Sequence, residues 1–227
     1  GLSRRGYRTW NVAAPISETL GAAIVLLSRF VPEEPFIDPM CGSGTMPIEA
    51  AMIGANIAPG MMREFTADCW GKVVPKKVWY NAYDEAEDMI RRDVQMNIQG
   101  YDLDPEIVKC AMANAKAAGV GDYIHFQARD VKDLRHPKHY GFIITNPPYG
   151  ERLEEKEALP ALYKTIGESF ANLPDWSMYL ITSYEDAEKY IGRKADRNRK
   201  IYNGMIKSYF YQFMGPKPPK NKEPKEQ

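Results

Sequence analysis

The chain has 227 residues, and its 30 Lys and Arg balance its 30 Asp and Glu, so the formal net charge is zero. Hydrophobic residues make up 44% and charged residues 26%, which excludes bulk disorder. No apolar run approaches the ~18 residues of a transmembrane helix. The length suffices for one α/β domain and not for two large ones. Three cysteines without a Cys-x-x-Cys spacing argue against a disulfide framework or a zinc site, and they favour a soluble protein of the reducing cytoplasm.

Helices and short apolar strands alternate along the first half of the chain. Pro15 begins a stretch with apolar residues at helical spacing, and a Gly-rich loop separates a short strand from the next helix. A segment with Pro59-Gly60, Trp70 and Trp79 interrupts this rhythm. The predicted elements are a helix over 15–30, a strand over 36–38, a helix over 45–53, an irregular segment over 55–79 and a helix over 80–96.

The alternation continues in the second half and ends in a hairpin. Asn203-Gly204 between two strand-like runs is a strong signal for a two-residue turn. Strands alternating with helices indicate a parallel sheet buried on both faces. The predicted elements are strands over 97–101, 123–127, 142–145 and 178–182, helices over 106–118, 158–172 and 185–191, and hairpin strands over 200–202 and 205–213.

The first candidate site is the loop Asp-Pro-Met-Cys-Gly-Ser-Gly-Thr, residues 38–45, at the end of the first strand. Gly42 and Gly44 allow a sharp turn and let a ligand approach the main-chain amides. An acid at the start of the loop suits a cationic group better than a pyrophosphate. Asp38 is therefore a candidate acceptor for the α-amino group of S-adenosylmethionine (SAM). The alternative is a glycine turn in which Asp38 is a cap, because the glycine pair alone is a weak signal.

Two further acids follow strands that neighbour this loop in the predicted sheet. Asp102 ends the second strand, where a carboxylate can accept from both hydroxyls of a ribose. Asp104, two residues on, is better explained as the start of the next helix. Asp130 follows the third strand, where it or the backbone near it can bind an adenine amino group; alternatively it is a surface turn acid, and Asp133 could be confused with it.

The most specific motif is Asn146-Pro147-Pro148-Tyr149, which follows a buried strand. An exocyclic amine is a poor nucleophile because its lone pair is delocalised. The Asn146 side-chain oxygen and the Pro147 carbonyl can accept its hydrogens and stabilise the positive charge that develops during methyl transfer. Two prolines stiffen the loop, and Tyr149 offers a face on which an unstacked base can lie. The alternative is a Pro-rich turn with a core tyrosine.

Histidines and basic clusters give weaker signals. His136 and His139 lack partners at metal-ligand spacing, so we interpret them as part of a polar loop and expect no metal. Two basic clusters either contact phosphates or form solvated faces. The clusters are Arg4, Arg5 and Arg8 with the interleaved Tyr7 and Trp10, and Arg193, Lys194, Arg197, Arg199 and Lys200.

Together, the Gly-rich loop and Asn-Pro-Pro-Tyr resemble the motifs of class I SAM-dependent amino-methyltransferases. Residues 5–8 (Arg-Gly-Tyr-Arg) and 14–20 (Ala-Pro-Ile-Ser-Glu-Thr-Leu) resemble the segment after the THUMP domain in THUMP-linked RNA methyltransferases. Residues 57–70 are similar to the bacterial branch that makes N2-methylguanosine in large-subunit ribosomal RNA. The resemblance covers roughly residues 2–214.

This resemblance implies a Rossmann-like class I methyltransferase fold, with a mostly parallel seven-stranded sheet, an antiparallel last strand and helices on both faces. It also implies a domain organisation. A basic segment over 1–14 would follow an absent THUMP domain, and a methyltransferase domain would cover 15–214. Within that domain, a family insert over 55–96 could help to hold RNA. Residues 215–227, rich in Pro and Lys, are expected to form a disordered tail.

The resemblance also implies roles for the site residues. Catalysis would fall at Asn146, Pro147, Pro148 and Tyr149. The residues expected to bind SAM, and its product S-adenosylhomocysteine, are Pro15, Ser17, Glu18, Thr19, Asp38, Pro39, Cys41, Gly42, Ser43, Gly44, Thr45, Asp102, Leu103, Asp130, Val131 and Asn146.

The function that the resemblance implies is methyl transfer to the exocyclic N2 amine of guanine in large-subunit (23S) ribosomal RNA. The Asn-Pro-Pro-Tyr loop alone does not distinguish this amine from adenine N6 in RNA or DNA, because the motif serves both. A protein-glutamine methyltransferase and a non-catalytic SAM- or RNA-binding module are further alternatives. The residues after Gly150 complete the sheet and leave no room for a DNA-recognition domain, which favours RNA. The segment after the THUMP domain and the 55–96 insert argue against a protein substrate.

Overall fold

The computed structural model describes residues 4–8, 16–150 and 153–219. A seven-stranded sheet in the order β3-β2-β1-β4-β5-β7-β6 runs through the centre of the molecule. The first five strands are parallel to one another, and β7 is antiparallel to both β5 and β6. The strands are β1 (Phe36–Asp38), β2 (Ile98–Asp102), β3 (Ile124–Ala128), β4 (Phe142–Thr145), β5 (Ser177–Thr182), β6 (Arg197–Asn203) and β7 (Ile206–Phe213).

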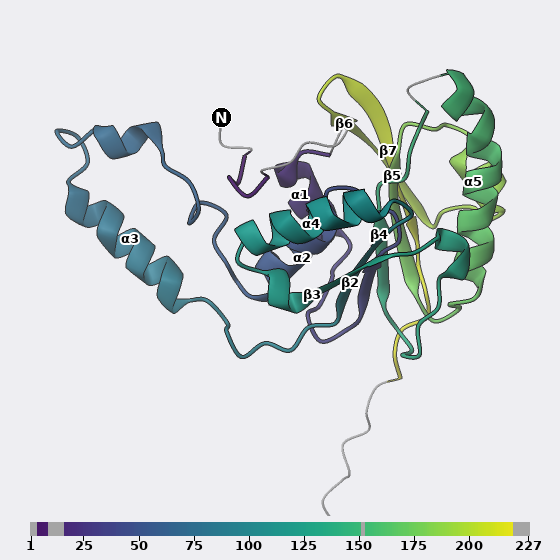
Figure 1. Cartoon of the computed structure of the whole chain (residues 1–227), viewed down its shortest axis with the longest axis horizontal. Coiled ribbons are helices and arrows are strands. Elements are labelled where there is room, and N and C mark those ends of the chain that lie inside the picture. Colours follow the sequence, from purple (N-terminus) through teal and green to yellow (C-terminus); the bar gives the residue numbers. More distant parts are fainter. Residues whose placement is uncertain (1–3, 9–15, 151–152, 220–227) are drawn as a thin grey trace, which may run out of the picture.

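Helices cover both faces of this sheet, as Figure 1 shows. On one face, α1, α2 and α4 contribute Ile24, Ile48 and Ala115 to an apolar core with β1, β4 and β7. On the other face, α5 and α6 pack Tyr163 and Ile191 against the sheet. The helices are α1 (Glu18–Leu27), α2 (Thr45–Gly54), α3 (Lys76–Asp88), α4 (Pro105–Ala117), α5 (Leu153–Ala171) and α6 (Ala187–Ile191), and short 3-10 turns lie at Thr66–Cys69, Gly121–Tyr123 and Val131–Asp133. The predicted Rossmann-like architecture is confirmed.

Three helices have bounds that differ clearly from those that the sequence predicts. The first helix begins at Glu18 rather than residue 15. The helix predicted over 80–96 is wrong at both ends: it spans Lys76–Asp88, after Pro75 at the N-cap. Residues beyond it return to the body, where the Arg91 amide donates to the Ala55 carbonyl at 2.8 Å. The helix predicted over 158–172 begins at Leu153 and contains Pro160.

Two segments project from the compact body. The segment with α3 extends away from the sheet in Figure 1, and none of the α3 residues is buried. At the other end of the sheet, β7 pairs with β5 only from Tyr209, which lies opposite Thr182. Ile206 and Lys207 therefore extend past the end of β5, and the β6–β7 hairpin overhangs the carboxyl edge of the parallel strands.

Gly215 packs against the body of the molecule, although the sequence assigns it to a disordered tail. Its amide donates to the Ser177 hydroxyl at 2.9 Å. An added Cβ there would lie 2.5 Å from the Trp176 carbonyl oxygen. Residues 220–227 lie outside the described part of the chain.

Candidate active site

A buried hydrogen bond joins the two loop motifs. Thr145 is the last residue of β4 and directly precedes Asn146, and its hydroxyl donates to Asp38 Oδ1 at 2.7 Å. Asp38 ends β1, the parallel neighbour of β4. Both residues are almost fully buried. The Gly-rich loop and the Asn-Pro-Pro-Tyr loop therefore leave the same edge of the sheet from adjacent strands, where open α/β sheets bind ligands.

Burial changes the protonation of Asp38. Asp38 is 1% exposed, and desolvation raises the pKa of its carboxyl group to about 7, although hydrogen bonds from Thr145 and the Met40 amide oppose this shift. Removal from water disfavours the charged form of any carboxyl group. A cation beside Asp38 would restore the charged form, so this group is suited to bind an ammonium group.

The Gly-rich loop takes a backbone conformation that glycine favours. Gly42 has φ +52° and Gly44 has φ +85°. An added Cβ at Gly44 would press on Ala111 and Phe126 at 3.1–3.2 Å, whereas one at Gly42 would meet nothing within 4 Å. The positive φ and the tight packing together favour glycine at position 44, and the space over Gly42 is open to a ligand. Most of the other loop residues are buried: Pro39, Cys41, Ser43 and Thr45.

Asp102 connects this loop to the start of α4. Its two carboxylate oxygens accept from the Gly42 amide and the Asp104 amide, each at 3.1 Å. Each carboxylate oxygen has two lone pairs, so Asp102 retains acceptor capacity for hydroxyl groups. Asp104 is the N-cap of α4, where it accepts from the Glu106 amide at 2.8 Å. Asp102 thus contacts the Gly-rich loop, whereas Asp104 caps a helix, as the sequence predicts for Asp104.

The third strand brings Asp130 to the same edge. Asp130 caps the Val131–Asp133 turn by accepting from the Lys132 amide at 3.0 Å, and it pairs with the Lys132 ammonium at 3.1 Å. The backbone hydrogen bond from Lys132 lowers the pKa of Asp130. Val131 is buried, while Leu103 after β2 is 72% exposed. The exposed Leu103 side chain can pack against the face of a flat ligand at this edge.

Arg8 joins the N-terminal segment to the Gly-rich loop. Its Nη2 donates to Thr45 Oγ1 at 2.8 Å and to the Ile16 carbonyl at 2.9 Å. Its Nε lies 3.9 Å from Glu18 Oε1. Ser17 is the N-cap of α1, Glu18 is buried and Thr19 is exposed. Ser17 and Glu18 thus begin a helix beside the Gly-rich loop, whereas Pro15 lies outside the described residues.

Two of the three arginines in the first basic cluster do not form an exposed surface for phosphates. Arg5 and Arg8 are only 12–13% exposed and lie near Glu49 and Glu18. Tyr7 is buried and donates to Glu49 at 2.9 Å. Burial raises the pKa of Glu49 to about 7, and the Arg5 charge opposes this shift. The arginine positions looked solvated in sequence because their acidic partners lie at least 10 residues away along the chain.

Tyr163 of α5 holds the Asn-Pro-Pro-Tyr loop in place. The Tyr163 hydroxyl donates to the Pro148 carbonyl at 3.3 Å and shares a hydrogen bond with the Thr182 hydroxyl. Thr182 Oγ1 in turn accepts from the Tyr184 amide at 3.0 Å. Gly150, at φ +72°, ends the loop where a Cβ would lie 2.9 Å from Lys156. The loop is therefore held by β4, α5 and β5 together.

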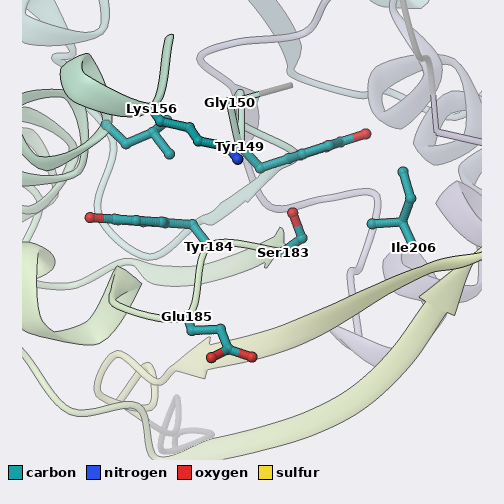
Figure 2. Close-up of a pocket in the computed structure, with 8 residues that line it drawn as sticks. Tyr149, Gly150, Lys156, Ser183, Tyr184, Glu185 and Ile206 are labelled. Atoms are coloured by element: carbon teal, nitrogen blue, oxygen red, sulfur yellow. The ribbon is translucent and has the colours of Figure 1, made fainter. Parts of the chain in front are cut away.

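An open cleft of about 420 Å³ lies beside this loop. Figure 2 shows the Tyr149 ring extending from the loop toward Ile206 of β7, with Ser183 beneath it. Tyr184 points to the opposite side. Glu185 forms part of the wall next to the hairpin. One aromatic ring and one aliphatic side chain at the mouth of such a cleft suit a flat aromatic group.

Sequence reasoning missed several of the residues that organise this site. Tyr163 falls within the helix predicted over 158–172, and nothing in the sequence signals a role for its hydroxyl. Thr145 was read as the end of an apolar strand. Glu185 was placed at the start of a short helix, although it lies in the cleft wall. Each role depends on strand neighbours that periodicity does not reveal.

His136 and His139 both contact neighbouring side chains. His136 lies edge-on to Trp176 at 5.0 Å between ring centroids, and His139 contacts Asp175 at 2.6 Å. Among the described residues, no group of three or more His, Cys, Asp or Glu is placed to hold a metal ion.

Within the same residues, no helix combines the length and the apolar character that crossing a membrane requires.

Known proteins share this sequence and fold. Residues 5–212 match the family described as RMKL-like, methyltransferase domain. The "Putative RNA methyltransferase YpsC" of Bacillus subtilis (strain 168) is 45% identical over 223 residues, which are 98% of this chain and 58% of YpsC. The structure of "SMU.472, a putative methyltransferase complexed with SAH" is 44% identical with a TM-score of 0.91, over 96% of this chain and 57% of that one.

A third relative is described as a predicted N6-adenine-specific DNA methylase from Listeria monocytogenes str. 4b F2365. It is 48% identical with a TM-score of 0.89, over 95% of this chain and 56% of that one. The fold, the two loop motifs on adjacent strands and these matches define a domain with the class I methyltransferase fold. The chain belongs to the RMKL-like methyltransferase domain family, and it spans somewhat more than half the length of the relatives it matches.

Proposed function

We propose that this protein is a SAM-dependent RNA methyltransferase that methylates the exocyclic N2 amine of guanine, in large-subunit ribosomal RNA. The observation that supports this most directly is the 2.7 Å hydrogen bond between Thr145 and Asp38. It holds the proposed cofactor loop and the proposed acceptor loop next to each other. A methyl donor and an amine must meet in line, and this edge of the sheet is where both could be bound.

The residues at the edge fit SAM. Asp38 would accept from the α-amino group, and the open space over Gly42 admits a ligand close to the backbone. Asp102 would accept from the ribose hydroxyls and Asp130 from the adenine amine, with Leu103 and Val131 against the adenine ring. Pro39, Cys41, Ser43, Gly44 and Thr45 would shape the loop, and Pro15, Ser17, Glu18 and Thr19 would close over the ligand. When bound, SAM supplies an electrophilic methyl group on a sulfonium centre. The relative SMU.472 was solved with S-adenosylhomocysteine.

The acceptor loop would provide the catalytic groups. The Asn146 side-chain oxygen and the Pro147 carbonyl would accept hydrogen bonds from the two N–H groups of the amine. These bonds strengthen as positive charge develops on nitrogen, so they favour the transition state over the ground state. Pro148 and its anchor Tyr163 keep the acceptors in place before the amine arrives. Tyr149 would stack on the target base beside the cleft.

RNA is favoured over other substrates by YpsC, whose name specifies an RNA methyltransferase. The Listeria relative is described as a predicted methylase of adenine N6 in DNA. An Asn-Pro-Pro-Tyr loop suits either amine. Adenine N6 is therefore the second candidate.

The deciding experiment measures methylated nucleosides. RNA from cells that lack the enzyme is incubated with SAM and either this protein or its Asn146→Ala variant, then digested and analysed by mass spectrometry. We expect N2-methylguanosine to rise with the wild-type protein alone. A rise in N6-methyladenosine would replace guanine by adenine as the target. No methylated nucleoside, in assays that also include any longer natural form of the protein, would reject an RNA substrate.

The Tyr163 anchor gives a further test. Tyr163→Phe removes the hydroxyl that contacts Pro148 and Thr182 and leaves the packed ring. We expect kcat for methyl transfer to fall about tenfold, since a loop displaced by a fraction of an ångström loses preorganisation, while the Kd for SAM stays within twofold. The lost hydrogen bonds should lower the free energy of unfolding by about 1 kcal/mol.

Tyr179→Phe is the matched control for this variant, because Tyr179 is a buried tyrosine of β5 whose hydroxyl donates to Met214 Sδ at 3.6 Å. Steady-state kinetics and SAM titration on both variants separate the effects. An equal loss of kcat in the two variants would show that Tyr163 acts through general stability and not through the loop.

A further inference from the structure

The β6–β7 hairpin borders the cleft that contains Tyr149. β7 continues past Thr182, the last residue of β5, as far as Ile206. Ile206 lines the cleft on the side toward which the Tyr149 ring extends, as Figure 2 shows. The Lys207 ammonium pairs with Glu185 in the cleft wall at 2.9 Å, and the Tyr209 hydroxyl donates to the same oxygen at 3.3 Å. The hairpin is thus anchored to the cleft and forms one of its borders.

Positive charge is concentrated along this hairpin. Residues 193–207 contain six Lys or Arg and a single acid, Asp196, in a chain whose net charge is zero. Asp196 already pairs with Arg193 at 3.1 Å. Arg197, Arg199 and Lys200 of β6 are exposed, and none of them pairs with a carboxylate among the side chains that the structure describes. β6 is the last strand of the sheet, so side chains from both of its faces border one free edge.

Large apolar and aromatic side chains are exposed at the turn between the strands and in β6 beside it. Met205 is 97% exposed and Tyr202 is 58% exposed. Charged residues on an edge strand can serve simply to prevent pairing with other chains, and that role would explain the arginines and Lys200 alone. It does not explain an exposed tyrosine and methionine at the turn. Basic side chains interleaved with an exposed aromatic ring are the combination that binds single-stranded nucleic acid through phosphates and base stacking.

The cleft lining carries charges of both signs. Lys156 and Glu185 line the cleft, and Glu185 is already paired with Lys207 at 2.9 Å. The cleft therefore has no concentration of positive charge like that along β6, and its Tyr149 and Ile206 side chains suit an uncharged base. This arrangement separates a place for a base, beside Tyr149, from a place for the adjoining phosphates, along β6.

We propose that the β6–β7 hairpin is the docking surface for single-stranded RNA, in which Arg197, Arg199 and Lys200 contact phosphates and Tyr202 stacks on a base next to the nucleotide in the cleft. This proposal rests on the proposed function, because it takes the cleft to be the place of the target base. It assigns the second basic cluster to RNA and leaves the first cluster with its structural role.

The test measures RNA binding directly, apart from methyl transfer. The Kd of a fluorescently labelled single-stranded RNA is measured by anisotropy at several salt concentrations for the wild-type protein, the Arg199→Ala/Lys200→Ala variant and the Tyr202→Ala variant. Two lost phosphate contacts should reduce the slope of log K against log salt by about 1.4, at ~0.7 for each contact with a single strand. Tyr202→Ala should weaken binding about tenfold, as expected for one stacked base, with the salt slope unchanged.

Lys116→Ala/Lys164→Ala is the matched control, since it removes two exposed charges from α4 and α5, and it should bind RNA like the wild type. SAM affinity and thermal unfolding, measured on every variant, should not change. Wild-type RNA affinity in the hairpin variants would overturn the proposal, as would an equal loss in the control variant or no RNA binding by the wild-type protein. Nucleoside analysis of the same samples reports the proposed function separately. Methylated RNA with unaltered binding in the variants would reject the hairpin and keep the activity.

Discussion

Replacing Asn146 with Ala is expected to reduce kcat for methyl transfer at least a hundredfold. The Asn146 side-chain oxygen is proposed to accept a hydrogen bond whose strength grows as the target nitrogen becomes positively charged. Loss of one such preorganised group typically costs about 10²–10³ in kcat. The Kd for SAM should change by less than threefold, because the main cofactor contacts lie on other strands. Single-turnover kinetics together with calorimetric titration of SAM would measure the two quantities.

The Asn146→Asp variant distinguishes the acceptor role from a donor role. A carboxylate keeps the acceptor oxygen and has no N–H, so this variant should retain more activity than Asn146→Ala. Asn172→Ala, at an exposed position after α5, is the control and should be fully active. Near-normal turnover by Asn146→Ala would refute the proposed chemistry, whatever the substrate.

Replacing Asp38 with Asn is expected to affect stability and SAM binding in opposite directions. In the folded protein the pKa of Asp38 is raised from 3.8 to about 7. Between these pH values the folded state keeps a proton that the unfolded state releases, so stability falls as the pH rises through this window. Each pKa unit corresponds to about 1.4 kcal/mol. The ligand-free Asp38→Asn variant should therefore be more stable than the wild type at pH 8, by up to about 4 kcal/mol, and indistinguishable at pH 3.5.

SAM binding should weaken in the same variant. An asparagine oxygen can still accept from Thr145 and the Met40 amide, but it carries no charge to pair with an ammonium group. A hydrogen bond to a charged group contributes about 1.5–3 kcal/mol, so the Kd should rise roughly tenfold to a hundredfold. For the wild type, SAM should bind more tightly as the pH rises from 6 to 7.5, since the bound ammonium lowers the pKa of Asp38.

Thermal unfolding from pH 3.5 to 8 and calorimetry across pH 6 to 7.5 would test both effects. Asp122→Asn, at an exposed carboxyl group, is the control and should show neither. An unchanged Kd would mean that Asp38 does not contact the amino group. A less stable variant at pH 8 would mean that the charge of Asp38 stabilises the fold despite its burial.

The fold and the site loops could be predicted because their signals are local. Asp38-Pro39 and Asn146-Pro147 each stop an apolar run, and Asn203-Gly204 specifies a tight hairpin without reference to the rest of the chain. The placement of residues at a common edge followed from the parallel sheet. Periodicity was less reliable in the 55–96 segment, because α3 packs on no sheet and none of its residues is buried.

The contacts that unite the site could not be predicted in the same way. Thr145 and Asp38 are 107 positions apart, and they meet only because β4 is placed beside β1. Arg8 looked like part of a basic surface, since nothing nearby in sequence shows that Thr45 and Glu18 surround it. A sequence pattern gives the type of side chain at a strand end, whereas strand order decides which of these side chains touch.

The position of β7 has a consequence for biosynthesis. β7 follows every other strand in the chain, yet it lies between β5 and β6. While the protein is being translated, β5 has an unpaired edge on this side until β7 is made, and β6 has no partner until β7 begins to emerge at Ile206. Chains fold vectorially during synthesis, and unpaired strand edges invite misassembly. The side of the cleft formed by Ile206 therefore cannot exist on a partly made chain, and a ribosome stalled shortly before the last strand would release a protein with an aggregation-prone edge and an incomplete acceptor site.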